Sequence, residues 1–212
     1  MKPKLLLADD HKIILDGLRS LLAADFDVVA TAADGRQLVD LATTLRPDVI
    51  VADISMPLLN GIEGVRQLRE AGSTAKVVFL TMHPDPSYLL RAIQACALGY
   101  VLKHAASEEL THAIRCALQN RLYVSPGLRT PAVEEMLDGT KTHLRASLEL
   151  TPRRREVLQL LAEGKSAKEI GAILDISART VETHKYKIMD DLGVKTTAEL
   201  VQHAIKEGIV ST

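Results

Sequence analysis

Acids, a hydroxyl and an amine stand at the ends of predicted strands in this sequence. They are Asp9, Asp10, Asp53, Thr81 and Lys103. In an open parallel sheet the carboxyl ends of the strands meet at one edge, so these groups are expected to lie together. Neighbouring carboxylates repel one another unless a cation lies between them, and hard cations such as Mg²⁺ take oxygen ligands. The pattern predicts a metal site beside a hydroxyl and an amine that can hold a phosphoryl group.

Each of these residues also has an ordinary structural explanation. A single aspartate after a strand is usually a turn or cap residue, and a single lysine there is usually exposed to solvent. Convergence on four of five predicted strand ends favours a functional site. A sheet with acids at its rim is also compatible with a phosphatase-like enzyme that has a helical cap, and this alternative remains open.

The elements that must position these groups are short apolar runs separated by amphipathic helical segments. The runs are almost continuously apolar, as in strands that are buried on both faces of a parallel sheet. Asp85 before Pro86, and Ser107 before two glutamates, are signals for helix starts. Residues 1–122 therefore predict a doubly wound α/β domain with a five-stranded parallel sheet. The predicted strands are 4–8, 27–32, 48–52, 76–81 and 99–103, and the helices are about 13–24, 36–45, 61–71, 86–98 and 107–120.

The rest of the chain shows no further strand pattern. Residues 123–147 are rich in proline and glycine and predict a linker, with one short helix over AVEEMLD (132–138). Residues 148–212 predict four helices, whose starts are Thr151 before Pro152, Ser166 with Glu169 in capping-box spacing, Ser177, and about residue 197. The second and third helices are joined by the short turn LDIS, which predicts a helix-turn-helix domain.

Composition and cysteine spacing argue against a disulfide-rich, a zinc-binding or a membrane protein. Apolar residues make up 47% of the chain and charged residues 25%, as in ordinary globular proteins, and the net charge of −1 gives no sign of a nucleic-acid partner. Cys96 and Cys116 have neither disulfide-framework nor zinc-site spacing. No signal peptide and no membrane-spanning run is present, which predicts a cytoplasmic protein without a membrane partner.

The motifs ADDH, DISMPLLNG, FLTMH and GYVLK resemble the receiver domain of bacterial response regulators, over residues 1 to about 122. The resemblance implies that Asp53 accepts a phosphoryl group from a sensor histidine kinase. It implies that Thr81 and Lys103 bind this group and that Tyr100 is the aromatic switch residue. The Mg²⁺ ligands it implies are Asp9, Asp10, Asp53 and the backbone carbonyl of Ser55.

Other residues stand close to these positions. Ser55 and His83 lie two residues after Asp53 and Thr81, where residues of the family border the phosphoryl group and influence its lifetime; solvent-facing loop residues are the alternative. His11 and His104 also adjoin site residues and are expected to be bystanders.

Residues 150–194 are similar to the LuxR-type helix-turn-helix, and together with the receiver they indicate the NarL/FixJ architecture. The recognition helix is expected at 178–191. Apolar positions such as Val181 and Ile188 are interpreted as packing against the neighbouring helices. The opposite face carries the candidate DNA contacts Arg179, Thr180, Glu182, Thr183, Lys185, Tyr186 and Lys187.

Two positions depart from the family pattern. Residue 154 is commonly glutamate, which closes a capping box, but this chain has Arg154; residue 191 is commonly lysine or arginine, but this chain has Asp191. Arg153, Arg154 and Arg155 then crowd a helix N-terminus, where they are expected to contact phosphate. Residues 148–212 hold ten basic and ten acidic residues, which predicts weak binding by a monomer and a need for dimerisation on paired half-sites.

The sequence thus predicts a two-component response regulator that is not itself an enzyme. Phosphorylation of Asp53 is expected to control sequence-specific binding to double-stranded promoter DNA. An atypical regulator that binds DNA without phosphorylation is the alternative. A homodimer is expected in the phosphorylated or DNA-bound state, and RNA polymerase is a further candidate partner.

Overall fold

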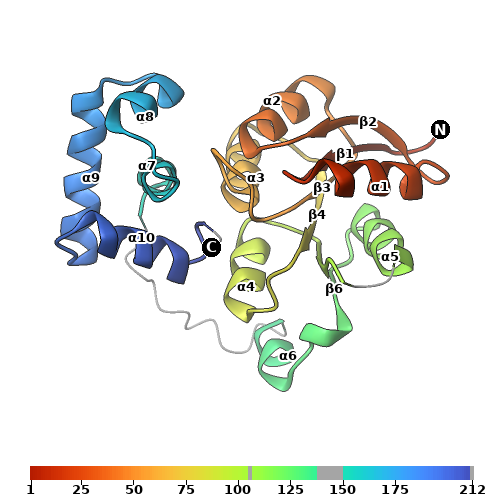
Figure 1. Ribbon diagram of the computed structural model, residues 1–212. Helices are drawn as coiled ribbons and strands as arrows, with labels where there is room; N and C mark the ends of the chain where they lie inside the picture. Colours follow the sequence, from red (N-terminus) through yellow and green to blue (C-terminus); the bar gives the residue numbers. More distant parts are fainter. Residues whose placement is uncertain (105–106, 138–149, 211–212) are drawn as a thin grey trace. The chain divides into compact units, whose positions relative to one another are not determined.

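The computed structural model of the protein describes residues 1–104, 107–137 and 150–210. The chain divides into two compact units, which are considered separately (Figure 1). The first contains the described residues up to 137 except 57–59, and the second contains 57–59 and the described residues from 150 on. Within the described ranges, no helix is both long enough and apolar enough to cross a membrane.

The first unit is built on a parallel sheet of six strands. The strands are β1 (Lys4–Ala8), β2 (Asp27–Ala32), β3 (Val49–Ala52), β4 (Lys76–Thr81), β5 (Gly99–Leu102) and β6 (Tyr123–Val124). Their order in the sheet is β2-β1-β3-β4-β5-β6, and every neighbouring pair is parallel. The predicted doubly wound α/β fold is confirmed. The predicted count of five strands is wrong, since the sheet also contains β6. The sequence does not reveal β6 because a strand of two residues shows no periodicity.

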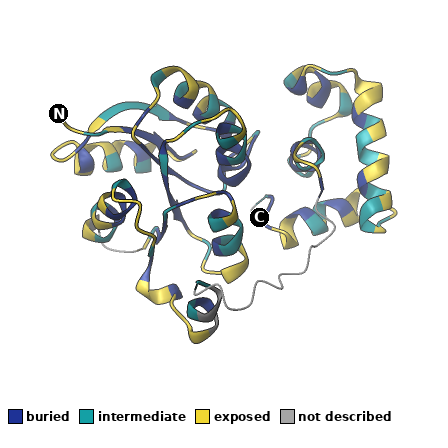
Figure 2. Ribbon diagram, turned by 180° about the vertical axis from the view of Figure 1, so that it is seen from behind, coloured by how far each residue is buried: buried dark blue, intermediate teal, exposed yellow. Residues whose placement is uncertain are grey.

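Helices cover both faces of this sheet. The helices are α1 (Lys12–Leu22), α2 (Gly35–Leu45), α3 (Gly61–Glu70), α4 (Pro86–Gln94) and α5 (Ser107–Leu118). In Figure 1, α1 and α5 lie on one side of the sheet and α2, α3 and α4 on the other. Alternate residues of β1 therefore enter two different cores, with Leu5 and Leu7 in one and Leu6 and Ala8 in the other. Figure 2 shows the resulting buried strands between helices with exposed outer faces.

Part of the segment predicted as a linker packs on the first unit. After β6 come a short 3₁₀ helix, η1 (Pro126–Leu128), and α6 (Pro131–Leu137), which confirms the short helix expected there. Val124, Leu128 and Val133 are buried in the core that also holds α2, α3 and α4. Ser125 is buried as well, and its hydroxyl accepts a hydrogen bond from the Leu102 amide and donates to Glu109. Residues 138–147 of the predicted linker lie outside the described residues.

The second unit contains four helices, and their caps follow the sequence signals. The helices are α7 (Pro152–Ala162), α8 (Ala167–Leu174), α9 (Ala178–Leu192) and α10 (Thr197–Lys206). Ser166 and Glu169 form the predicted capping box, and the Ser177 hydroxyl accepts from the Thr180 amide. Gly193 ends α9 in the left-handed conformation that glycine favours, with φ of 66°. The core of this unit is aliphatic and includes Leu158, Ile170, Val181, Ile188 and Leu200.

Candidate functional site

The carboxyl edge of the sheet gathers the acids, the hydroxyl and the amine. β1, β3, β4 and β5 lie side by side, so the residues at their ends become neighbours although up to 94 positions separate them in the chain. The Asp53 amide donates to Ala8 O at 2.8 Å and the Lys103 amide to Thr81 O at 2.8 Å. These bonds extend the strand pairing by one residue and fix where both side chains start.

Lys103 links two of the carboxylates. Its ammonium nitrogen lies 2.7 Å from Asp9 Oδ2 and 2.7 Å from Asp53 Oδ2, and all three side chains are buried. Burial alone would lower the pKa of Lys103, but hydrogen bonds to the two acids outweigh it and the pKa is raised. Burial raises the pKa of Asp53, and the hydrogen bond from Lys103 opposes this rise. One cation thus serves two buried anions, which leaves negative charge for a further cation.

Asp9, Asp10 and His11 form a group that could hold a metal ion. Their ligand atoms all lie within 4.8 Å of one another. His11 Nδ1 is 2.8 Å from Asp10 Oδ1 and 3.2 Å from Asp9 Oδ1, so His11 is in contact with the site, whereas the sequence suggested a bystander. The oxygen donors of both aspartates suit Mg²⁺. Asp53 is joined to this group through Lys103 and Asp9.

Thr81, His83 and Tyr100 are connected next to the acids. The buried Thr81 hydroxyl accepts from the His83 amide at 3.2 Å, and the Tyr100 hydroxyl donates to His83 O at 2.8 Å. Tyr100 is only 1% exposed, and its burial raises the pKa of the phenol. Tyr100, which the sequence suggested as the switch residue, is therefore buried in the first unit. It is hydrogen-bonded to His83, two residues after Thr81.

The His83 side chain bridges Ser55, in the loop after β3, to α4. Its Nε2 lies 2.6 Å from the Ser55 hydroxyl, and its ring stacks on Tyr88 of α4 at a centroid distance of 4.1 Å. Burial lowers the pKa of His83, which favours the neutral ring. The sequence left open whether Ser55 and His83 belong to the site or are solvent-facing loop residues. The structure places them in contact with each other at the carboxyl edge of the sheet.

Gly61 is a residue of this site that sequence reasoning missed. It begins α3, and its amide donates to Ile54 O at 2.9 Å. A Cβ at this position would lie 2.1 Å from the backbone oxygen of Asp53, so no other residue fits without moving the loop. The Asn-Gly pair that ends DISMPLLNG was the available signal, because such pairs mark special backbone turns.

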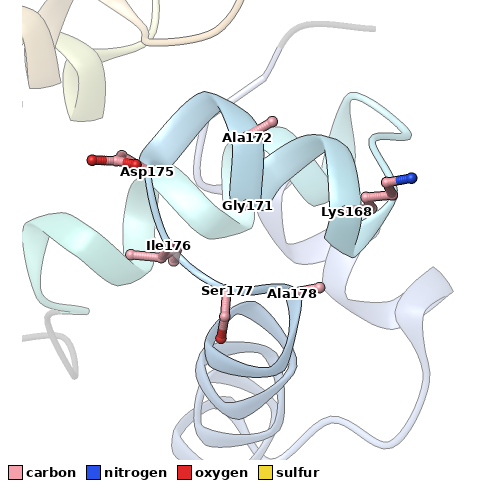
Figure 3. A pocket seen from close by; sticks show the side chains of 7 residues that line it. All are labelled: Lys168, Gly171, Ala172, Asp175, Ile176, Ser177 and Ala178. Carbon is pink, nitrogen blue, oxygen red and sulfur yellow. The ribbon is translucent and has the colours of Figure 1, made fainter.

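The helical unit forms the predicted helix-turn-helix. The turn after α8 borders a shallow hollow, and Figure 3 shows its lining residues, which come from α8, the turn and the start of α9. Gly171 lets the turn pass close to α8, since a Cβ there would lie 2.6 Å from Ile176 O. The prediction of a tight turn at LDIS is therefore confirmed.

The candidate DNA contacts lie on α9, and their exposure differs. Arg179, Thr180, Thr183, Tyr186 and Lys187 are exposed, whereas Glu182 and Lys185 are half-buried. The Thr180 hydroxyl is paired with Ser177 at 2.8 Å, so Thr180 supports the helix cap. Within the described residues of the helical unit, the face of α9 opposite Val181 and Ile188 is exposed to solvent.

Arg153 and Arg154 at the start of α7 bind other helices of the unit. Arg153 donates to Leu174 O at 2.6 Å and to Glu156 at 2.9 Å, and Arg154 is paired with Asp191. The sequence suggested phosphate contacts for the arginine cluster, but these two guanidinium groups instead bind α8 and α9. Thr151 makes no side-chain cap bond, so α7 begins without a capping box.

Comparisons with known proteins match both units. The model of the response regulator receiver domain matches residues 5–115, and that of bacterial regulatory proteins of the luxR family matches residues 148–204. Transcriptional regulatory protein MctR of Rhizobium johnstonii is 34% identical, with 99% of this chain and 96% of that protein covered. Oxygen regulatory protein NreC of Staphylococcus epidermidis is 35% identical, with 98% and 99% covered.

Solved structures agree with these matches. The response regulator ChrA of a heme-sensing two-component system is 33% identical, with 99% of both chains covered and a TM-score of 0.51. RcsB of Salmonella enterica serovar Typhimurium, bound to promoter DNA in the presence of the phosphomimetic BeF3⁻, is 26% identical, with 95% and 98% covered and a TM-score of 0.62.

Proposed function

The chain belongs to the NarL/FixJ family of two-component response regulators, and on this basis we propose that phosphorylation of Asp53 controls promoter binding by α9. The observation that carries the proposal is the pairing of Lys103 with Asp53 and Asp9, both at 2.7 Å, beside the buried Thr81. This arrangement supplies a carboxylate acceptor, an amine and a hydroxyl at one strand edge.

In the proposed reaction, a carboxylate oxygen of Asp53 attacks the phosphorus of a phosphohistidine on the sensor kinase. The new P–O bond forms as the P–N bond breaks, and the departing imidazole keeps the electron pair and takes up a proton. Lys103 and the Thr81 hydroxyl then bind the phosphoryl oxygens. Asp9, Asp10, Asp53 and the Ser55 carbonyl would hold Mg²⁺, which would neutralise charge on the phosphoryl group.

The phosphoryl group adds roughly −1.5 to −2 charges next to Thr81. Movement of Thr81 would be felt by Tyr100, because both bond to His83. The receiver surface around α4 and β5 would then change, which biases an existing equilibrium between states. We infer that the active state is a homodimer that binds paired half-sites of promoter DNA in the cytoplasm, where RNA polymerase is a further candidate partner.

A phosphodonor experiment tests this proposal. Treatment with acetyl phosphate and Mg²⁺ should add one phosphoryl group to the wild type, detected by mass spectrometry, and none to Asp53→Asn. Asp40→Asn, which changes an exposed acid on α2, is the matched control and should behave as wild type. A gain that survives Asp53→Asn would contradict the proposal.

Genome-wide DNA pull-down with the same proteins separates the alternatives. Phosphorylated wild type should recover promoter fragments that Asp53→Asn does not. Equal recovery by both proteins would support the atypical regulator. Multiple turnover on a phosphomonoester would support the phosphatase-like enzyme.

A further inference from the structure

The outward face of α9 is chemically mixed. With 3.6 residues per turn, positions 179, 183 and 186 fall on one line, opposite the buried Val181 and Ile188. Glu182 lies on one flank of this line and is half-buried. A helix that reads DNA through phosphate contacts alone would carry only cations and neutral donors here, so the acid requires another explanation.

The Thr183 hydroxyl has already used its proton. It donates to the backbone oxygen of Arg179 at 2.9 Å, one turn earlier in the helix. A threonine has a single hydroxyl proton, so no donor remains for acceptors such as guanine O6 and N7 or thymine O4. The γ-methyl remains on an exposed side chain. Its match in the major groove is the C5-methyl group of thymine.

Glu182 is a free acceptor. Within the described part of the chain it makes no hydrogen bond and no ion pair, although Lys185 is nearby in sequence. An ionised carboxylate can only accept hydrogen bonds, and phosphates repel it. The amino group of cytosine N4 is its partner in the major groove, while the acceptor-only edge of guanine and the O4 of thymine oppose it.

We propose that Glu182 and Thr183 set the base preference of the half-site, with cytosine read by Glu182 and thymine by Thr183. This proposal rests on the proposed function of α9 as the DNA reader and specifies what it reads. Glu182 acts mainly by rejecting bases that present acceptors, and Thr183 acts through its methyl group.

The test is selection from random double-stranded DNA by the full-length protein activated with beryllofluoride and Mg²⁺. The wild type should select half-sites that contain a cytosine and a thymine. Glu182→Gln should move the cytosine preference to adenine, because glutamine bonds adenine N6 and N7, with a change of about tenfold in relative affinity. Gain of a new base cannot result from misfolding. Asp190→Asn, which removes an exposed acid near the C-terminal end of the same helix, is the matched control and should select the wild-type site.

Two variants separate the methyl group of Thr183 from its hydroxyl. Thr183→Ala keeps an apolar group and should retain the thymine, whereas Thr183→Ser should lose it. Deoxyuridine in place of that thymine removes only the C5-methyl group, so it should weaken the wild type several-fold and leave Thr183→Ser unaffected.

The failures are distinguishable. If the wild type selects a site and both Glu182→Gln and Thr183→Ser select the same one, this inference is overturned while the proposed function stands. If the activated wild type selects no site at all, the proposed function falls, and the inference falls with it.

Discussion

Arg154 of α7 is ion-paired with Asp191 of α9. Related LuxR-type domains commonly have glutamate at the first position and a basic residue at the second, so both charges are reversed in this chain. Two departures that look independent in the sequence are one compensated exchange in the structure. The pair joins the first helix of the unit to the recognition helix, and both side chains are partly buried.

The exchange predicts how variants of the pair behave. Arg154→Glu alone places an acid against Asp191 and should lower the free energy of unfolding of the helical unit by about 1 kcal/mol. Arg154→Glu combined with Asp191→Lys should recover wild-type stability, because the attraction is restored in the opposite sense. Hydrogen exchange of the amides in α7 and α9, measured in the full-length protein, reports this locally. Additive losses in the double variant would argue against coupling.

The raised pKa of Asp53 predicts that this acid lowers the stability of the receiver when it is ionised. A group that holds its proton more tightly in the folded chain favours unfolding once it ionises. The free energy of unfolding should therefore fall as the pH rises from the ordinary value of 3.8 through the raised pKa. Without divalent cations, Asp53→Asn should be more stable than wild type at pH 7.

Thermal unfolding in EDTA tests the effect of Asp53. The gain in melting temperature from Asp53→Asn should shrink as the pH falls below 3.8, where Asp53 becomes protonated in both states. Asp40→Asn, an exposed acid, should show no gain at either pH. A gain that is independent of pH would show that the charge of Asp53 is not its cause.

The acidic group predicts where Mg²⁺ binding is lost. Asp10→Asn removes one anionic ligand and leaves Asp53 and its bond to Lys103 in place. Mg²⁺ affinity measured by calorimetry should drop about tenfold or more, and phosphorylation should slow while its endpoint remains at Asp53. Asp16→Asn, in the first half of α1, provides the control. Unchanged Mg²⁺ affinity in Asp10→Asn would exclude Asp10 as a ligand.

The contact between His83 and Ser55 predicts the lifetime of the phosphoryl group. The 2.6 Å contact joins the loops that follow Asp53 and Thr81, so its loss should let these loops separate and admit water more easily. His83→Ala and Ser55→Ala should each shorten the lifetime several-fold, followed by loss of radiolabelled phosphate. Because both break one bond, the double variant should be no faster than the faster single variant.

Regular elements and strand-end residues are readable from this sequence because local chemistry determines them. Apolar runs give β1 to β5, and Ser166, Ser177 and Asp85 mark helix starts through bonds to residues two or three positions away. Asp9, Asp53 and Lys103 meet because parallel strands always bring their carboxyl ends to one edge. These inferences need only the order of elements in the chain.

What the sequence does not reveal depends on contacts between distant residues. Arg154 and Asp191 are 37 positions apart, and neither suggests the other without the packing of α7 on α9. His11 comes directly after Asp9 and Asp10, but its ring can adopt several rotamers. The sequence therefore does not show that the ring contacts both acids. The two residues of β6 become a strand only because β5 offers an edge on which they can pair.

That pairing at β5 has a consequence for how the receiver behaves when it is cut from the chain. Unpaired edge strands invite association with other chains, and proteins cover them or keep them short. A fragment that stops at residue 122 would leave the Leu98 and Tyr100 carbonyls without their hydrogen-bond donors. It would also expose the apolar core residues that Leu128 and Val133 cover. Such a fragment should self-associate in light scattering at concentrations where a fragment ending at residue 137 stays monomeric. Residues 123–137, which the sequence assigns to a linker, are thus expected to protect the edge of the sheet from aggregation.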